Sequence, residues 1–362
     1  MIPITKPFLP PLSDYQSLVE DIWQRNLLTN NGPLVQRFER EVSEYLGTEP
    51  ILFTGSGTIA LQIAIKALNL SGEIITTPFS YVATTSAIVW ENCTPVFIDI
   101  DPDTFNMNHN CIEKAITEKT SAILATHVFG NPCNVEEIEK IARAHDLKVI
   151  YDAAHCFGST YRGKSVFNRG DVSITSFHAT KLLHTVEGGA LFTSDERLYK
   201  RMRTMRNFGH AGPENFDGVG INGKNSEFHA AMGLCNLNYI NDVLERRRYQ
   251  VTLYKKLLQS DQIYTMKLQE GADWNHAYFP LLFKNERSML QIRVLLEKNN
   301  IFTRRYFYPR LDSLNYTQPA ELIHTERVSS SVLCLPLYHD LQDTEIERVC
   351  GLIKNEFNRK QS

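Results

Sequence analysis

Short apolar runs alternate with amphipathic segments along the first two thirds of the chain. In segments such as 58–69 and 135–146, apolar residues recur at positions i, i+3 and i+4, which is typical of one face of a helix. Several runs are rich in isoleucine and valine and apolar on both faces, as expected for strands that helices cover on each side. The seven runs that we interpret as strands are 51–53, 73–77, 95–99, 121–128, 147–153, 172–177 and 189–194.

This alternation predicts an α/β fold with a mostly parallel seven-stranded sheet, right-handed crossovers and helices on both faces. The pattern changes after about residue 240, where 239–259 predicts a long amphipathic helix. Further helix patterns follow at 288–300 and 344–357. We therefore expect a large domain over residues 1–245 and a smaller α+β domain over residues 246–362.

Composition narrows the class of protein. The net charge of -3 gives no indication of nucleic acid or an anionic membrane as a partner. The N-terminus lacks the features of a signal peptide, and no apolar run approaches the length of a membrane span. The seven cysteines are scattered and never form a C-x-x-C pair, which argues against a disulfide framework or a zinc site. We expect a cytoplasmic protein with reduced thiols and no metal site.

A turn of small residues, TGSGTIAL at 54–61, lies between a predicted strand and a predicted helix. Such a turn leaves backbone N–H groups open, and the helix start favours an anion. The turn matches neither the Walker A loop nor the G-x-G-x-x-G motif of nucleotide-binding proteins. An ordinary turn with Ser56 or Thr58 as helix cap explains it about as well.

Two chemically versatile residues follow neighbouring strands. Asp152 ends the strand predicted at 147–153, and Lys181 follows the strand predicted at 172–177. Strand ends of an α/β sheet face one crevice, so both side chains can approach one bound molecule, and His155 can join them if the chain turns helical there. A lysine acts as a Schiff-base nucleophile when burial favours its neutral form. Taken alone, Asp152 could equally cap a following helix, and Lys181 could be a surface charge.

Together these motifs resemble the sugar aminotransferases of the DegT/StrS type, a pyridoxal-phosphate family with the aspartate aminotransferase fold (fold type I). The resemblance runs nearly end to end and rests on many motifs in one order. They lie at 27–47, 55–61, 76–88, 95–106, 152–163, 170–181, 187–193, 220–234 and 335–338. The resemblance implies a large domain that binds pyridoxal 5'-phosphate, followed by a smaller C-terminal domain.

The resemblance also implies roles for single residues. Lys181 would hold the cofactor covalently through its amine, and Asp152 would pair with the pyridine nitrogen and keep it protonated. His155 stands where the family has a glutamine or histidine close to the ring hydroxyl. Tyr81 matches the aromatic residue that stacks on the ring, with Phe79 as the alternative.

Further positions match the family's phosphate and substrate sites. Gly57, Thr58 and Ser176 match the phosphate cradle. Lys224 matches a position that reaches the phosphate of the neighbouring subunit, which implies at least a homodimer with shared active sites. Tyr308 lies in a turn that only loosely matches the family's pattern, and we expect it to line the substrate site. His184 has no role that the sequence reveals.

The implied reaction moves the amino group of L-glutamate to the keto carbon of a nucleotide-linked 4-keto-6-deoxyhexose. The motifs around Lys181 are most similar to members that convert dTDP-4-keto-6-deoxyglucose to dTDP-4-amino-4,6-dideoxyglucose for O-antigen and other polysaccharides. A UDP- or GDP-linked sugar, or a 3-keto sugar, is the alternative. The family's dehydratase branch has histidine in place of this lysine, so Lys181 favours transamination. A silent cofactor-binding regulator is the non-enzymatic alternative.

Overall fold

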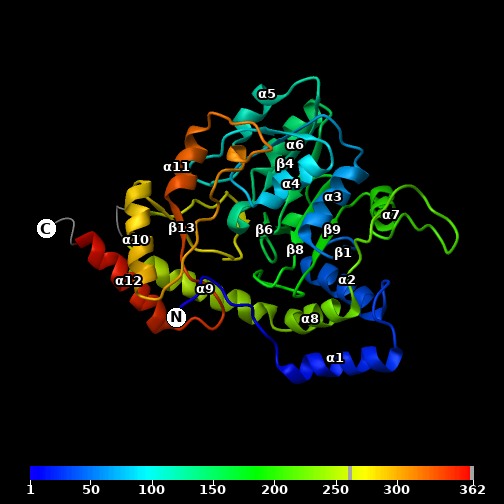
Figure 1. The fold of residues 1–362 in the computed structure, drawn as a ribbon, viewed down its shortest axis with the longest axis horizontal. Helices are drawn as coiled ribbons and strands as arrows, with labels where there is room; N and C mark the ends of the chain where they lie inside the picture. The colour runs from blue at the N-terminus through cyan, green and yellow to red at the C-terminus, as the bar shows by residue number, and fades with distance from the viewer. Residues whose placement is uncertain (260–262, 359–362) are drawn as a thin grey trace.

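The computed structural model describes residues 1–259 and 263–358 (Figure 1). A seven-stranded sheet with the strand order β1-β9-β8-β5-β4-β2-β3 forms its centre. The strands are β1 (Leu52–Thr54), β2 (Glu73–Thr76), β3 (Thr94–Phe97), β4 (Thr120–Thr126), β5 (Lys148–Asp152), β8 (Val172–Ser176) and β9 (Gly189–Phe192). Each coincides with one of the seven predicted runs to within two residues. The prediction of an α/β fold with a mostly parallel seven-stranded sheet is confirmed.

Strand β9 is the exception to the parallel arrangement. It pairs antiparallel with both of its neighbours, β8 and β1, whereas β8, β5, β4, β2 and β3 pair in parallel. The segment 177–188 that joins β8 to β9 contains no helix. A parallel return requires a crossover, usually helical, so the chain doubles back beside β8 instead. This return places Lys181 on a loop at the carboxyl end of β8.

Helices cover both faces of the sheet (Figure 1). Side chains alternate between two cores: Phe53 and Ile75 belong to one, while their neighbours Leu52 and Ile74 belong to the other. Helices of the first core are α1 (Leu12–Arg25), α2 (Pro33–Leu46), α5 (Ile112–Ala115), α6 (Val135–Ala144) and α8 (Glu227–Leu237). Helices of the second are α3 (Gly57–Ala67), α4 (Val82–Trp90) and α7 (Glu196–Met205).

The C-terminal part builds a third core around a small antiparallel sheet, at the left of Figure 1. The sheet contains β10 (Ile263–Tyr264), β12 (Pro280–Phe283) and β13 (Val332–Cys334), and the helices beside it are α10 (Glu286–Lys298), α11 (Ile323–Ser331) and α12 (Asp343–Asn358). The N-terminus joins this part, since Ile2 pairs with Ile301. Among the described residues, no helix combines the length and the apolar character needed to cross a membrane.

Two features bear on the predicted domain boundary between residues 245 and 246. Helix α9 (Ile240–Leu257) runs through it and connects the two parts. Strand β11 (Ala272–Asp273) pairs with β6 (Thr160–Tyr161), which forms a hairpin with β7 (Lys164–Ser165) beside the large sheet. The division at this boundary stays a prediction, and residues 260–262 and 359–362 of the predicted C-terminal domain lie outside the described residues.

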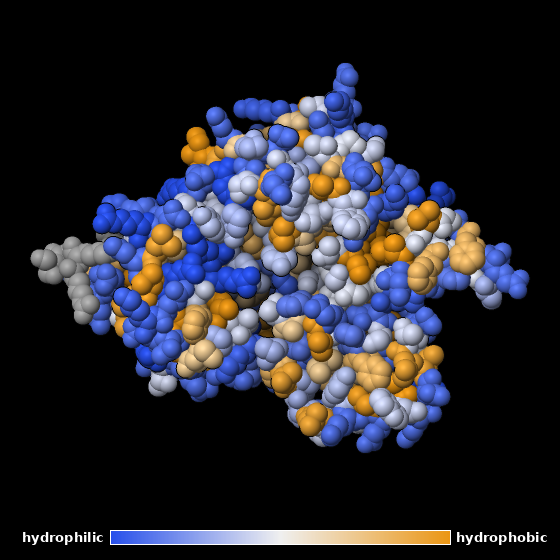
Figure 2. All heavy atoms as spheres, viewed as in Figure 1, coloured by the Kyte–Doolittle hydropathy of each residue, from blue (hydrophilic) through white to orange (hydrophobic). Residues whose placement is uncertain are grey.

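The exposed apolar side chains of the large part include two groups. Leu12 and Trp23 lie on the outer side of α1, and Phe216 and Val219 lie on the loop that follows α7; all four are more than half exposed. Figure 2 shows apolar side chains over both regions, on the right of the molecule. Large exposed apolar patches are typical of surfaces that bind a protein, a membrane or a ligand.

A buried carboxylate ties α8 to α2 and α1. Glu227, the first residue of α8, is fully buried and accepts hydrogen bonds from the backbone N–H groups of Leu34 (3.0 Å) and Val35 (2.9 Å), and from the Arg25 guanidinium (3.0 Å). Gly32, which precedes α2, has no side chain to cap the helix, and a Cβ there would lie 2.6 Å from Glu227 Cδ. The α2 N-terminus is therefore capped by a carboxylate from another helix.

We predict that Glu227→Ala lowers the free energy of unfolding by about 3 kcal/mol, because two buried N–H groups and one guanidinium lose their acceptor. Urea unfolding measures the loss. The matched control is Glu41→Ala, which removes a surface pair with Arg37 (2.7 Å) within α2 and should cost at most about 0.5 kcal/mol. Equal, small losses in both variants would show that the cap contributes nothing.

Candidate active site

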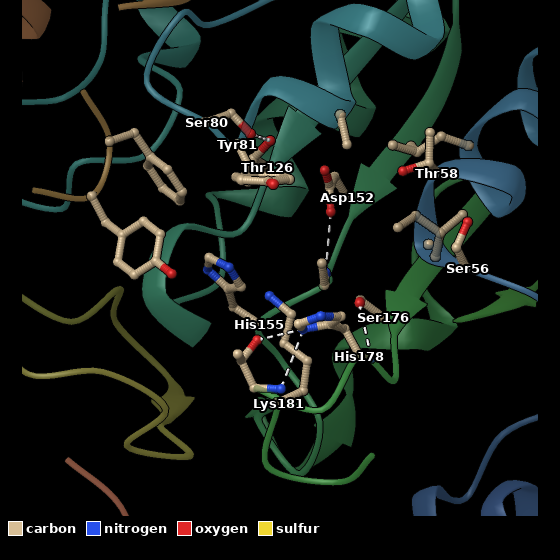
Figure 3. Close-up of a pocket in the computed structure, with 18 of the residues that line it drawn as sticks. Ser56, Thr58, Ser80, Tyr81, Thr126, Asp152, His155, Ser176, His178 and Lys181 are labelled. Atoms are coloured by element: carbon tan, nitrogen blue, oxygen red, sulfur yellow. Dashed lines mark hydrogen bonds between the residues drawn. The ribbon is translucent and has the colours of Figure 1, made fainter. Parts of the chain in front are cut away.

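A pocket lies at the carboxyl edge of the large sheet, against the C-terminal part of the chain (Figure 3). Asp152, Ser176 and Thr126 are the last residues of β5, β8 and β4, which are neighbours in the sheet. Because parallel strands end at one edge, these side chains meet there. The pocket brings together most of the predicted site residues: Gly57, Thr58, Tyr81, Asp152, His155, Ser176 and Lys181.

The turn before α3 forms one end of the pocket. Ser56 caps α3 by accepting a hydrogen bond from the Ile59 backbone N–H (3.1 Å), so the cap predicted at Ser56 or Thr58 is Ser56. A Cβ on Gly57 would lie 3.2 Å from Ser176 Cβ, which shows how closely the helix start approaches the end of β8. A small anion fits here, because the N-terminus of α3 favours negative charge, Gly57 leaves space by having no side chain, and the Ser176 hydroxyl can donate a hydrogen bond.

Asp152 is almost fully buried, and each of its oxygens has a donor. Thr84 Oγ1 donates to Oδ2 (2.7 Å), and the Ala154 backbone N–H donates to Oδ1 (3.1 Å). A chain of hydroxyls extends from Thr84 through Ser80 (2.7 Å) to Thr126 (3.0 Å). The segment 153–159 forms turns, so Asp152 does not cap a helix. Its carboxylate remains available to a cation in the pocket.

Lys181 faces the same space as Asp152 from the loop after β8 (Figure 3). Burial lowers the pKa of the Lys181 amine to about 8, and the Asp152 carboxylate opposes this shift. Burial also raises the pKa of the Asp152 carboxyl. The hydrogen bonds from Thr84 and Ala154 and the charge of Lys181 lower this pKa and so oppose the shift. Near neutral pH a useful fraction of Lys181 is therefore a neutral amine, the form that attacks a carbonyl carbon.

His155 and Tyr81 supply the aromatic surfaces of the pocket. The His155 ring lies 4.6 Å from the Tyr278 ring and parallel to the Phe307 ring, and burial keeps its pKa well below the ordinary value. Its Nδ1 is buried, with no hydrogen-bond partner among the described residues. Tyr81 lines the pocket, whereas Phe79 is buried in the C-terminal core, so the geometry favours Tyr81 as the stacking residue.

Lys224 lies outside the pocket of its own chain. Its Nζ donates to Asn222 Oδ1 (2.9 Å) and lies 4.7 Å from the centre of the Phe208 ring. Burial, followed by the charge of Arg206, lowers its pKa. The contact with a neighbouring subunit stays a prediction.

Tyr308 also lies outside the pocket, contrary to the expectation from the sequence. The backbone of Arg304 pairs with β13, and the residues after it turn so that Tyr306 and Phe307 line the pocket. Tyr308 lies under the Arg305 guanidinium (3.5 Å to the ring centre) in a separate surface hollow. The aromatic wall is therefore formed by Tyr306 and Phe307, which precede Tyr308 in the chain.

Sequence reasoning missed the C-terminal wall and the hydroxyl chain. Tyr278 lines the pocket although its segment carries no motif that points to it. Arg304 and Tyr306 belong to the turn for which only Tyr308 was predicted to line the substrate site. Thr126 could have been found, since it ends the strand beside that of Asp152 and the same strand-end rule applies.

His184 has a structural role. Its Nε2 lies 2.7 Å from the Phe8 carbonyl oxygen, and Asn236 donates to the His184 carbonyl oxygen (2.9 Å). The side chain thus fastens the N-terminal segment to the loop that carries Lys181.

The pocket residues fit pyridoxal phosphate. The α3 start, Gly57 and Ser176 suit its phosphate, the Asp152 carboxylate suits a protonated ring nitrogen, and the unpartnered Nδ1 of His155 suits a ring hydroxyl. Lys181 supplies the amine that an aldehyde requires.

Comparison with known proteins leads to the same family. The DegT/DnrJ/EryC1/StrS aminotransferase family matches residues 13–354. The dTDP-4-amino-4,6-dideoxy-D-glucose transaminase of Shigella dysenteriae is 39% identical over 358 residues, covering 97% of this chain and 98% of that protein. The GDP-perosamine synthase of Escherichia coli O157:H7 is 31% identical over 364 residues, covering 98% of each.

Among solved structures, that of DesI in the presence of its TDP-sugar product is similar, with a TM-score of 0.93 and 32% identity, covering 100% of this chain and 96% of that one. The match with the family extends over all the predicted site residues, from Gly57 to Tyr308. This chain therefore belongs to the DegT/DnrJ/EryC1/StrS aminotransferase family and is a pyridoxal-phosphate-dependent enzyme, as its motifs predicted.

Proposed function

We propose that this enzyme transfers the amino group of L-glutamate to C4 of dTDP-4-keto-6-deoxyglucose and so produces dTDP-4-amino-4,6-dideoxyglucose. The observation that carries the proposal is that the Lys181 amine and the Asp152 carboxylate line one pocket beside an anion cradle. Likeness to the Shigella transaminase over 97% of the chain supports this choice of sugar. Likeness to GDP-perosamine synthase supports a GDP-linked sugar as the second candidate.

The cofactor would be held at three points. Gly57, Thr58 and Ser176 would hold its phosphate, and Tyr81 would cover one face of its ring. Asp152 would keep the pyridine nitrogen protonated, because a buried carboxylate favours a cation beside it. When bound, pyridoxal phosphate supplies an electron sink for the charge left on a carbon that loses a proton.

Lys181 has two tasks in this proposal. Its amine anchors the cofactor while no substrate is bound. When a substrate frees it, the neutral Nζ takes the proton from the α-carbon of glutamate, and in the second half of the reaction it moves a proton in the reverse sense at the sugar carbon. A pKa of about 8 suits a group that must both accept and release a proton near neutral pH.

We further propose a homodimer with shared active sites. Lys224 lies outside its own pocket, in the segment that follows the exposed Phe216 and Val219. A second copy packing on this apolar surface would bring Lys224 to the partner's phosphate cradle. A role in O-antigen or other polysaccharide synthesis, in the cytoplasm where nucleotide sugars are made, completes the proposal.

The variant Lys181→Ala should lose both turnover and the visible absorbance band of lysine-bound pyridoxal phosphate, because no other amine replaces the anchor. Absorbance spectra and an aminotransferase assay measure the two losses. Lys140→Ala, at an exposed surface pair with Glu137, is the control and should behave as wild type. Activity retained without Lys181 would disprove its assigned role.

In Asp152→Asn the cofactor should still bind, but turnover should fall by about 10²–10³-fold, because a neutral amide does not keep the pyridine nitrogen protonated. The cofactor content of the purified variant and its turnover under saturating substrates are the two measurements. A near-normal rate would mean that the ring nitrogen has another partner.

A half-reaction screen identifies the sugar. The enzyme is first converted with L-glutamate to the amine form of the cofactor, and a panel of dTDP-, GDP- and UDP-linked 3-keto and 4-keto sugars is then added. We expect dTDP-4-keto-6-deoxyglucose to restore the visible absorbance fastest. Faster recovery with a GDP-linked sugar would favour the second candidate. A silent cofactor-binding regulator would show no change even with glutamate.

A further inference from the structure

The loop 177–188, which carries Lys181, continues the antiparallel pairing of β8 with β9. In that pairing Ser176 lies opposite Gly189. Two backbone hydrogen bonds extend the register into the loop, from Phe177 N–H to the Gly188 carbonyl (2.8 Å) and from Ala179 N–H to the Val186 carbonyl (2.8 Å). His178 therefore lies directly opposite Glu187, and alternation places this pair on the same side of the ladder as Ser176 of the predicted phosphate cradle.

The side chains of this pair contact each other inside the pocket. His178 Nδ1 lies 2.8 Å from Thr180 Oγ1 and accepts a hydrogen bond from the Thr180 backbone N–H (3.3 Å), and the other ring nitrogen is Nε2. That Nε2 lies 3.6 Å from Glu187 Oε1. Both residues line the pocket, and Figure 3 shows His178 beside Lys181. The two side chains, each about half exposed, thus lie beside each other across the loop.

The backbone also holds Glu187 in place. Val186, just before it, has φ of 69°, a left-handed conformation that is rare for a β-branched residue and is found mainly where a structure requires it. The carbonyl oxygen of Glu187 accepts hydrogen bonds from Thr185 Oγ1 (2.8 Å) and Asn225 Nδ2 (2.8 Å). The left-handed Val186 and the bonds to the Glu187 carbonyl fix the backbone from which the Glu187 side chain extends.

A carboxylate in this position is at odds with the charges of both proposed substrates. Glutamate carries two carboxylates, and a nucleotide sugar carries a diphosphate, so an anionic Glu187 repels these groups. The pocket offers Arg304, from the C-terminal part of the chain, as a cation for them. The one cationic group of glutamate is its amino group, which reacts at the cofactor, so a neutral group with hydrogens to donate is what remains for this carboxylate to bind. The hexose ring is the part of either substrate rich in hydroxyls.

On the basis of the proposed function, we propose that Glu187, with His178 beside it, recognises the C3 hydroxyl of the hexose in the second half of the reaction. The carbon that accepts the amino group must reach Lys181, which lies on the same loop as Glu187. In a 4-keto-6-deoxyhexose the neighbouring C5 bears a methyl group and no hydroxyl, so the hydroxyl next to the reacting carbon is the one on C3.

Separate measurement of the two half-reactions tests this proposal. Glu187→Gln should raise the sugar concentration that half-saturates the second half-reaction by about 10-fold, and Glu187→Ala by about 100-fold, as expected when a hydrogen bond to a charged acceptor weakens or is lost. The glutamate half-reaction should stay within about twofold of wild type, because glutamate has no hydroxyl for Glu187 to bind. Glu297→Gln, at an exposed pair with Arg293 on α10, is the matched control.

A 3-deoxy analogue of the sugar supplies the second arm. Wild type should discriminate against the analogue by about 10- to 100-fold, and Glu187→Ala should lose this discrimination, because the partner of the missing hydroxyl is already gone. His178→Ala should raise the half-saturating sugar concentration by about fivefold without lowering the maximal rate of either step. A purely structural role for His178 would slow the glutamate step as well.

Cofactor absorbance and thermal unfolding show whether each variant is folded. Normal sugar half-saturation in both Glu187 variants would overturn the proposal, as would equal damage to the glutamate step or unchanged discrimination against the 3-deoxy analogue. If wild type itself accepts no sugar of the panel, the proposed function fails, and this inference fails with it.

Discussion

Burial of an amine opposite a carboxylate is the constraint on which the rest of the site depends. Asp152 is buried and Lys181 is partly buried, and burial disfavours the charged form of each. Their mutual attraction offsets part of that cost, and the hydrogen bonds from Thr84 and Ala154 offset more on the carboxylate side. As a result, the Lys181 amine has its pKa lowered to about 8 and shares the pocket with the carboxyl group of Asp152. This combination suits Schiff-base chemistry at neutral pH.

The topology of the sheet maintains this arrangement. Asp152 ends a parallel strand, and Lys181 lies on the loop through which the chain returns as the antiparallel strand β9. A helical crossover after β8 would have carried the lysine away from the edge. Because the loop continues the β8–β9 ladder, it also sets His178 against Glu187 and thereby brings a second polar pair to the pocket.

The other wall of the pocket comes from segments far along the chain. Tyr278, Arg304 and Tyr306 reach it because α9 brings the C-terminal core against the sheet edge, and the N-terminal segment connects that core with the lysine loop through His184. The wall at the sheet edge thus carries Asp152 and Lys181, and the C-terminal wall carries aromatic rings and the Arg304 guanidinium.

The sequence by itself determined the seven strands, their helical covers and the strand-end residues Asp152 and Lys181, because these follow from local periodicity and from a rule about where parallel strands end. It also determined the family, through many motifs in one order. Tertiary structure alone decided that Tyr81 and not Phe79 faces the pocket, that Tyr308 lies outside it, and that Glu187 meets His178. These outcomes depend on the packing of segments distant in the chain and on the register of a loop, which no local pattern encodes.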